Sequence, residues 1–220
     1  MFSYLLAFGV SFSATILTVG WLITNLKIKG IVGIDMNKED QPSIPEMGGI
    51  SVIIGFILGI YSQIFVFKIF SIGHQIDTYM LCALVTVIGI SFVGIIDDLL
   101  GVRQSVKAVL PFIFALPLGF FVSTEMTIPI FGEYDFGILM IFLVPFAITC
   151  ASNSTNMLEG FNGLGTGLCI IISFSLCFMA LINNEREAMY LLIPLLGSLI
   201  AFWFYNKYPA KIFPGDTLTM

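Results

Sequence analysis

The sequence predicts an all-α fold, a bundle of transmembrane helices that crosses the bilayer about seven times. Of its 220 residues, 58% are hydrophobic and only 10% are charged, whereas soluble domains carry roughly 25% charged residues. A soluble fold of this size could not keep so much apolar surface out of water, which excludes the soluble classes. The charged residues are also unevenly placed, and long charge-free stretches separate them.

Seven of these stretches are long enough to span a membrane. They cover residues 1–26, 47–67, 78–96, 108–124, 136–158, 160–184 and 188–206. A helix needs roughly 17–25 mainly apolar residues to cross the hydrocarbon core. Lipid offers no hydrogen bonds, so the backbone must satisfy its own as helices, and the stretches do not alternate as barrel strands would. We therefore expect one integral membrane domain over residues 1–220. Its first stretch is a spanning helix, since it lacks a signal peptide's basic start and cleavage site.

The basic residues predict the orientation of the bundle. The loops after the first, third, fifth and seventh stretches hold seven of the nine cations: Lys27, Lys29, Lys38, Arg103, Lys107, Lys207 and Lys211. The other loops hold Lys68 and Arg186. By the positive-inside rule the first set of loops faces the cytoplasm.

Cysteine and histidine predict no metal site. The four cysteines lie within apolar stretches, without metal-type spacing, and behave as small hydrophobes. The one histidine, His74, is expected in an outer loop.

Four polar clusters are expected together on the cytoplasmic face. They are Gly33-Ile-Asp-Met-Asn-Lys38 with Ile44-Pro-Glu-Met-Gly-Gly49, then Asp97-Asp98 with Lys107, then residues 153–167, and finally Lys207 to Asp216. Each has an ordinary structural explanation, as a solvated loop, a neutralised helix end, a glycine packing surface or a helix cap. Together, acids, amides, lysines and glycines on one face fit an anionic, metal-chelated substrate.

Two of the clusters indicate chemistry most directly. Asp97 and Asp98 are expected at a helix C-terminus, where anions are disfavoured, and paired carboxylates suit Mg²⁺ or Mn²⁺. Asn153 and Asn156 share one helical face with Glu159, and the glycines after them allow close backbone approach to phosphate.

These motifs resemble the polyprenyl-phosphate N-acetylhexosamine-1-phosphate transferases. The resemblance lies in Glu46-Met-Gly-Gly49, Asp97-Asp98, Asn153-x-x-Asn156, Asn162-Gly163-Leu164 and Phe213-x-Gly-Asp216, in this order. The motif Gly33-x-Asp-x-Asn-Lys38 and the run from Lys207 to Thr217 are most similar to the eukaryotic and archaeal branch, whose members transfer GlcNAc-1-phosphate to dolichyl phosphate.

The resemblance implies a reaction and its participants. A polyprenyl phosphate attacks UDP-GlcNAc and releases UMP, the first membrane step of lipid-linked glycan assembly, such as that for N-glycosylation. Mg²⁺, or alternatively Mn²⁺, is the implied cofactor. The bilayer is a partner, nucleic acid is not, and a homodimer is left open.

The resemblance also assigns roles to individual residues. Asn156 and Asp216 would bind the metal. Lys107 would hold the phosphates, and Asp97 and Asp98 would orient the nucleophile or the metal shell. The substrate-binding residues would be Asp35, Glu46, Asn153, Asn162 and Phe213, with Asn162 and Phe213 serving the uracil. Glu159 receives no role, because bacterial members have Asp there and the eukaryotic enzyme has Ala.

Family members continue past the Gly-Asp motif with further helices and a cytoplasmic loop, so we expect the chain to be C-terminally incomplete relative to them. The membrane would be the plasma membrane in a prokaryote, with the site facing the cytoplasm, or that of the endoplasmic reticulum in a eukaryote. The alternatives are a bacterial-type undecaprenyl-phosphate transferase and, outside the enzymes, a transporter or a structural membrane subunit. A transporter is expected to carry ionisable residues near the bilayer midplane, whereas the acids here lie at the ends of the stretches.

Overall fold

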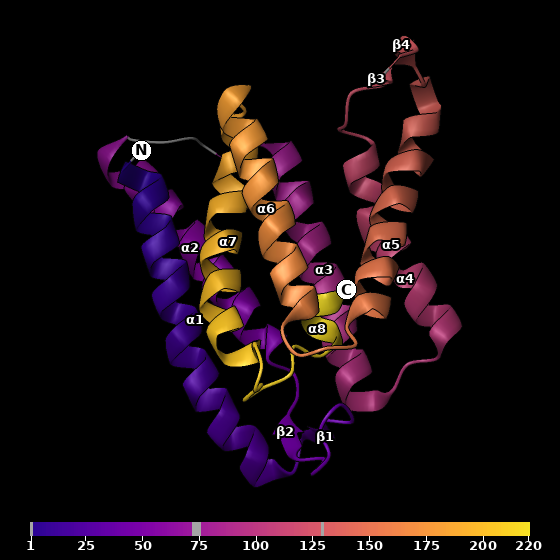
Figure 1. The fold of residues 1–220 in the computed structure, drawn as a ribbon. Helices are drawn as coiled ribbons and strands as arrows, with labels where there is room; N and C mark the ends of the chain where they lie inside the picture. The colour runs from indigo at the N-terminus through magenta and orange to yellow at the C-terminus, as the bar shows by residue number, and fades with distance from the viewer. Residues whose placement is uncertain (1, 72–75, 129) are drawn as a thin grey trace.

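A computed structural model of the protein describes residues 2–71, 76–128 and 130–220, and it confirms the all-α prediction (Figure 1). The helices are α1 (Phe2–Lys29), α2 (Gly49–Phe70), α3 (Thr78–Leu100), α4 (Gln104–Gly119), α5 (Met140–Leu158), α6 (Leu164–Ile182), α7 (Arg186–Asn206) and the short α8 (Asp216–Thr219). Two hairpins join them, β1 (Val32–Ile34) with β2 (Ser43–Pro45) and β3 (Glu125–Ile128) with β4 (Gly132–Asp135). A 3₁₀ turn, Gly137–Leu139, precedes α5.

Within these described ranges, six helices are long and apolar enough to span a membrane. The exception among the seven expected helices is α4, with 16 residues. It begins four residues before the charge-free stretch 108–124, so that Lys107 lies inside it, and it ends at Gly119. A charge-free stretch shows only which residues tolerate lipid; the helix ends depend on the following turn and hairpin. His74, expected in an outer loop, lies outside the described residues.

One side of the bundle is built from α1, α2 and α7, which pack closely on one another. Small residues make this approach possible: a methyl group at Gly55 would lie 2.7 Å from the carbonyl oxygen of Ser11, and one at Gly197 would lie 2.9 Å from that of Phe8. Such small-residue contacts are typical of helices that pack in lipid. Val19, Val52 and Phe202 are fully buried in this part of the bundle. The other side is formed by α3 with α4 and α4 with α5.

The four polar clusters meet at one end of the bundle, as the sequence predicted. Figure 1 shows the β1–β2 hairpin, the α3–α4 connection and the α5–α6 turn at this end, with α8 inside the bundle just above them, while the β3–β4 hairpin lies at the opposite end. Helix α8 contacts α3, α2 and α5. That this end faces the cytoplasm stays a prediction.

Candidate active site

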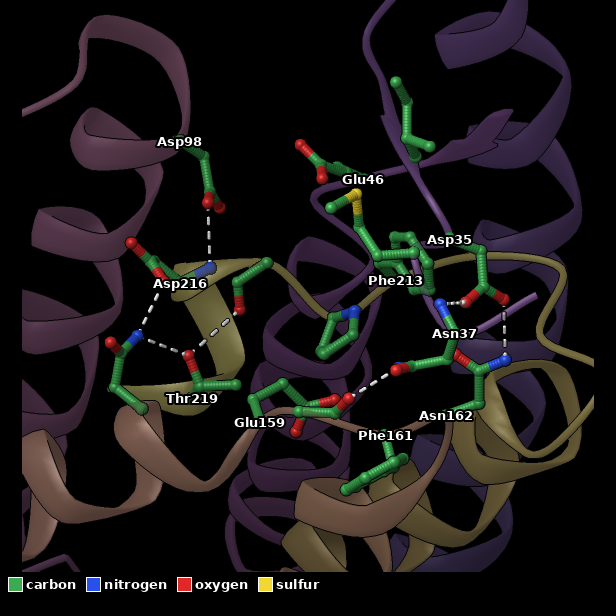
Figure 2. Close-up of a pocket in the computed structure, with 16 residues that line it drawn as sticks. Asp35, Asn37, Glu46, Asp98, Glu159, Phe161, Asn162, Phe213, Asp216 and Thr219 are labelled. Atoms are coloured by element: carbon green, nitrogen blue, oxygen red, sulfur yellow. Dashed lines mark hydrogen bonds between the residues drawn. The ribbon is translucent and has the colours of Figure 1, made fainter. Parts of the chain in front are cut away.

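A cavity of about 440 Å³ opens at the end of the bundle where the polar clusters meet, within the range of small-molecule sites. Figure 2 shows side chains from the β1–β2 hairpin, α3, the α5–α6 turn and α8 around it. The predicted site residues in its lining are Asp35, Glu46, Asp98, Asn156, Asn162, Phe213 and Asp216. Residues far apart in the sequence thus share one polar cavity.

Backbone contacts between two glycines and the segment before α8 set the position of Asp216. The N–H groups of Gly48 and Gly49 donate to the carbonyls of Phe213 (2.9 Å) and Pro214 (2.7 Å). A side chain would prevent this approach, because a methyl group at Gly48 would lie 2.8 Å from the Phe213 carbonyl oxygen. Gly215 then turns the chain with a φ of +67°, a conformation that favours glycine. The two glycine motifs thus fit together to start α8 at Asp216.

Asp98 caps the first turn of α8. Its carboxylate accepts hydrogen bonds from the backbone N–H of Asp216 (2.8 Å), the N–H of Thr217 (3.2 Å) and the hydroxyl of Thr217 (2.9 Å). A carboxylate at a helix N-terminus satisfies unpaired N–H groups and complements the helix dipole. Asp98 therefore holds Asp216 in place.

The ammonium group of Lys107 lies between two carboxylates. It is 2.7 Å from Asp97 and forms a second ion pair with Asp216. Lys107 is only 6% exposed, so these charges compensate one another where water is largely excluded. The amide nitrogen of Asn156 donates to Asp216 (2.6 Å) and to the hydroxyl of Thr219 (2.8 Å).

The donors around Asp216 fit a magnesium ion that substrate phosphates and water help to bind. Mg²⁺ commonly uses one or two carboxylates together with waters and phosphates rather than a full protein cage. Asp216 and Asp97 already share one cation, the ammonium of Lys107, and the Asn156 amide is adjacent. Among the described residues, no three His, Cys, Asp or Glu side chains form a metal site of their own. A metal bound beside Asp216 would therefore need ligands in addition to these acids.

Asp35 links the β1–β2 hairpin to the turn between α5 and α6. Its buried carboxylate accepts from the amide of Asn162 (3.0 Å) and the backbone of Asn37 (3.2 Å), and it pairs with Lys38 (3.0 Å). These contacts lower the pKa of Asp35, and the hydrogen bond from the Asn162 amide contributes most. Asn37 donates in turn to the carbonyl of Gly160 (2.8 Å). The hairpin is thereby fastened to the loop that carries Asn162.

Glu46 and Glu159 add acidic groups to the cavity. Burial, and the negative charges of Asp98 and Asp216, raise the pKa of Glu46. Burial raises the pKa of Glu159 to about 7, although the backbone N–H of Gly165 partly opposes the shift. The sequence assigned Glu159 no role, yet its side chain lines the cavity beside Phe161.

Three predicted residues lie outside the lining of this cavity, and several residues that line it were not predicted as site residues. Lys107 pairs with both Asp97 and Asp216, which places Lys107 and Asp97 beside the cavity. The Asn153 amide instead donates to the carbonyl of Thr149 one turn earlier (2.9 Å). Asn37, Glu159, Phe161 and Thr219 are among the lining residues that were not predicted as site residues. Phe161 could have been predicted from its position between Glu159 and Asn162. No feature of the sequence indicates that Thr219 lines the cavity.

The fold and the site define a polytopic membrane protein with an acid-, amide- and lysine-containing cavity at one end of the bundle. Residues 80–220 match the family model described as glycosyl transferase family 4, and the chain belongs to that family.

Three relatives illustrate the similarity. A protein of Saccharolobus solfataricus, provisionally named UDP-N-acetylglucosamine–dolichyl-phosphate N-acetylglucosaminephosphotransferase, is 38% identical over 98% of this chain. The Saccharomyces cerevisiae protein of that name is 31% identical over 86% of the chain. A Bacillus subtilis protein, provisionally named undecaprenyl-phosphate N-acetylglucosaminyl 1-phosphate transferase, is 29% identical over 94%. The chain spans 66%, 52% and 58% of these relatives' lengths, respectively.

Proposed function

We propose that the protein transfers GlcNAc-1-phosphate from UDP-GlcNAc to a polyprenyl phosphate of the dolichyl type, with release of UMP. The observation that carries the proposal is the meeting of Asp98, Asn156, Asn162, Phe213 and Asp216 in one cavity at the end of a transmembrane bundle. The names of the archaeal and yeast relatives support the choice of sugar and lipid.

The reaction joins two anions, so its main requirements are positioning and neutralisation of charge. Lys107 supplies a compact cation and lies in contact with Asp216. Asp216 and Asn156 would hold Mg²⁺, or alternatively Mn²⁺, which when bound neutralises charge on the diphosphate and the leaving UMP. Asp97 keeps Lys107 in place, and Asp98 keeps Asp216 in place.

The nucleophile in this proposal is the lipid phosphate itself. A phosphate monoester has a second pKa near about 6 and is therefore largely dianionic at neutral pH. The site does not need a strong base to activate it, which favours direct attack on the β-phosphorus over a covalent aspartyl intermediate.

Asp216 and Asn162 lie on opposite sides of the cavity in Figure 2, which offers separate places to the two parts of the donor nucleotide. In this proposal the diphosphate lies near Asp216 and its ion-pair partner Lys107. The uracil lies near Asn162 and Phe213, which offer a hydrogen-bonding amide and an aromatic face. The charge-free helices give the isoprenoid tail an apolar surface next to the site. We place the cavity on the cytoplasmic side, in the plasma membrane of a prokaryote or the endoplasmic reticulum membrane of a eukaryote.

The test is transfer of radiolabel from UDP-GlcNAc into a lipid diphosphate, measured together with UMP release. We expect activity with Mg²⁺ or Mn²⁺, none in excess EDTA, and loss of activity in Asp216→Asn. Asp135→Asn, an exposed carboxylate on β4 at the opposite end of the bundle, is the matched control and should retain activity. Full turnover in EDTA would refute the metal, and absence of labelled lipid diphosphate would refute the reaction.

The second candidate is transfer to undecaprenyl phosphate, which the name of the Bacillus relative favours. Dolichyl and undecaprenyl phosphates differ in the saturation of the first isoprene unit, so parallel assays with the two acceptors separate the candidates. A higher kcat/KM with undecaprenyl phosphate would replace our choice of lipid.

A further inference from the structure

The carboxylate of Asp35 is buried and serves as an acceptor for a neighbouring amide. Asp35 is 2% exposed, and its oxygens accept from the Asn162 amide nitrogen, the Asn37 backbone and the Lys38 ammonium. Because these donors lower the pKa of Asp35, the group is ionised at neutral pH. An ionised carboxylate has no proton to donate and can only accept.

This fixes which way the Asn162 amide faces. The nitrogen and oxygen of an asparagine amide look alike in shape, and their assignment depends on hydrogen-bond partners. At Asn162 the partner is an anion 3.0 Å away, so the nitrogen must face Asp35, and the reversed amide would bring two oxygens together. Figure 2 shows the Asn162 nitrogen directed at Asp35. Among the described residues, no donor satisfies the Asn162 oxygen, and Asn162 lines the cavity.

We propose that Asp35 is a positioning residue for base recognition, which fixes the Asn162 amide so that its oxygen is offered to the N3–H of uracil. The inference deepens the proposed function and rests on it, since it requires a uridine nucleotide in the cavity. Uracil carries a proton on N3, whereas cytosine has a lone pair there. An oxygen held at that position accepts from uracil and repels cytosine.

The aromatic residues of the cavity cannot make this choice. Phe161 and Phe213 line the cavity, but stacking tolerates every base because every base has a π-face. Discrimination therefore depends on a polar group that contacts the base edge, and a freely turning amide would accept either base. The carboxylate of Asp35 removes that freedom.

Asp35 also has a structural role, which the test must separate from positioning. Its partner Lys38 lies over the ring of Tyr208, 5.4 Å from the ring centre. Loss of Asp35 thus weakens this attachment of the hairpin as well as releasing Asn162. Lys38→Met breaks the same ion pair and the contact with Tyr208 while leaving the Asp35–Asn162 hydrogen bond, and it is the matched control.

The experiment measures binding of UMP and CMP to the purified protein by calorimetry, with KM and kcat for UDP-GlcNAc alongside. We expect the wild type to prefer UMP by about tenfold, the size of one well-placed hydrogen bond. In Asp35→Asn the amide can turn, so the preference should fall to about threefold or less, with KM rising more than kcat falls. Lys38→Met should keep the wild-type preference. The preference of UMP over 3-methyl-UMP, which lacks the N3 proton, tests the same contact in the wild type without any substitution.

Several results would overturn the inference. They are an undiminished UMP preference in Asp35→Asn, an equal loss in Lys38→Met, or 3-methyl-UMP binding as tightly as UMP. A wild type that transfers GlcNAc-1-phosphate but binds UMP and CMP equally would end the inference and leave the proposed function standing. A wild type that neither transfers the sugar phosphate nor binds uridine nucleotides would end both.

Discussion

Substitution of Gly94 by alanine should disable the site without contacting any substrate. Gly94 lies in α3, directly against the start of α8. A methyl group there would lie 2.5 Å from the carbonyl carbon of Asp216 and 2.6 Å from the backbone nitrogen of Thr217. Carbon atoms rest at about 3.5–4.0 Å, so α8 must move by about 1 Å. Misplacement of a catalytic group by about 1 Å can cost on the order of 10² in rate.

The direction of the effect is unambiguous because alanine favours α-helix over glycine by about 1 kcal/mol. The substitution therefore stabilises α3 as a helix. Any loss of stability or activity must come from the contact with α8, where overpacking typically costs about 1–3 kcal/mol. The assay is UMP release from UDP-GlcNAc at matched protein levels. The control is Gly20→Ala in α1, where an added methyl group meets nothing within 4 Å. A Gly94→Ala protein that works within about threefold of the wild type would refute our account of how Asp216 is positioned.

Three further predictions concern the cap, the orientation and the pH response. Asp98→Ala removes the cap on α8, so we expect the free energy of unfolding to fall by about 1–2 kcal/mol. Thermal unfolding measures this loss, and UMP release should fall at least tenfold. Wild-type stability together with wild-type UMP release would contradict the role of the cap. In a cysteine-free background, an impermeant maleimide should label Glu133→Cys but not Lys29→Cys or Lys207→Cys in intact cells, and the reverse pattern would invert the topology. Burial raises the pKa of Glu159 from 4.5 to about 7, so its contribution to stability is full below about pH 4.5 and is lost as the pH rises through about 7. The melting temperature of the wild type relative to Glu159→Gln should fall over that interval, and a constant difference would show that Glu159 does not titrate there.

The membrane helices were predictable because the bilayer limits what a spanning segment can be. A stretch such as 78–96 can cross hydrocarbon only as a helix, and the structure has α3 there. The boundaries of α4 were less predictable, because Lys107 marks the limit of the charge-free stretch 108–124 but lies inside the helix. The burial of this lysine depends on Asp97 and Asp216, and one of these lies more than a hundred positions away.

The gathering of the polar clusters was predictable for a related reason. Each spanning helix carries the chain to the opposite side, so counting spans places Asp35, Asp97, Asn156 and Asp216 at one end. The motifs also identified the family, because the residue types and their order suffice for that resemblance.

The sequence by itself indicated the approximate depth of the polar clusters, at the ends of the spanning stretches, since a long charge-free stretch marks a helix that can cross the bilayer. Only the tertiary structure decided which residues meet at that depth, because lateral position depends on how the helices pack. Asp35 pairs with Asn162 across 127 positions, and Asp98 caps α8 from 118 positions before it. The position of α8 depends on close approach at glycines. Gly48 and Gly94 permit that approach, but no periodicity or spacing in the sequence shows which segment packs against each glycine.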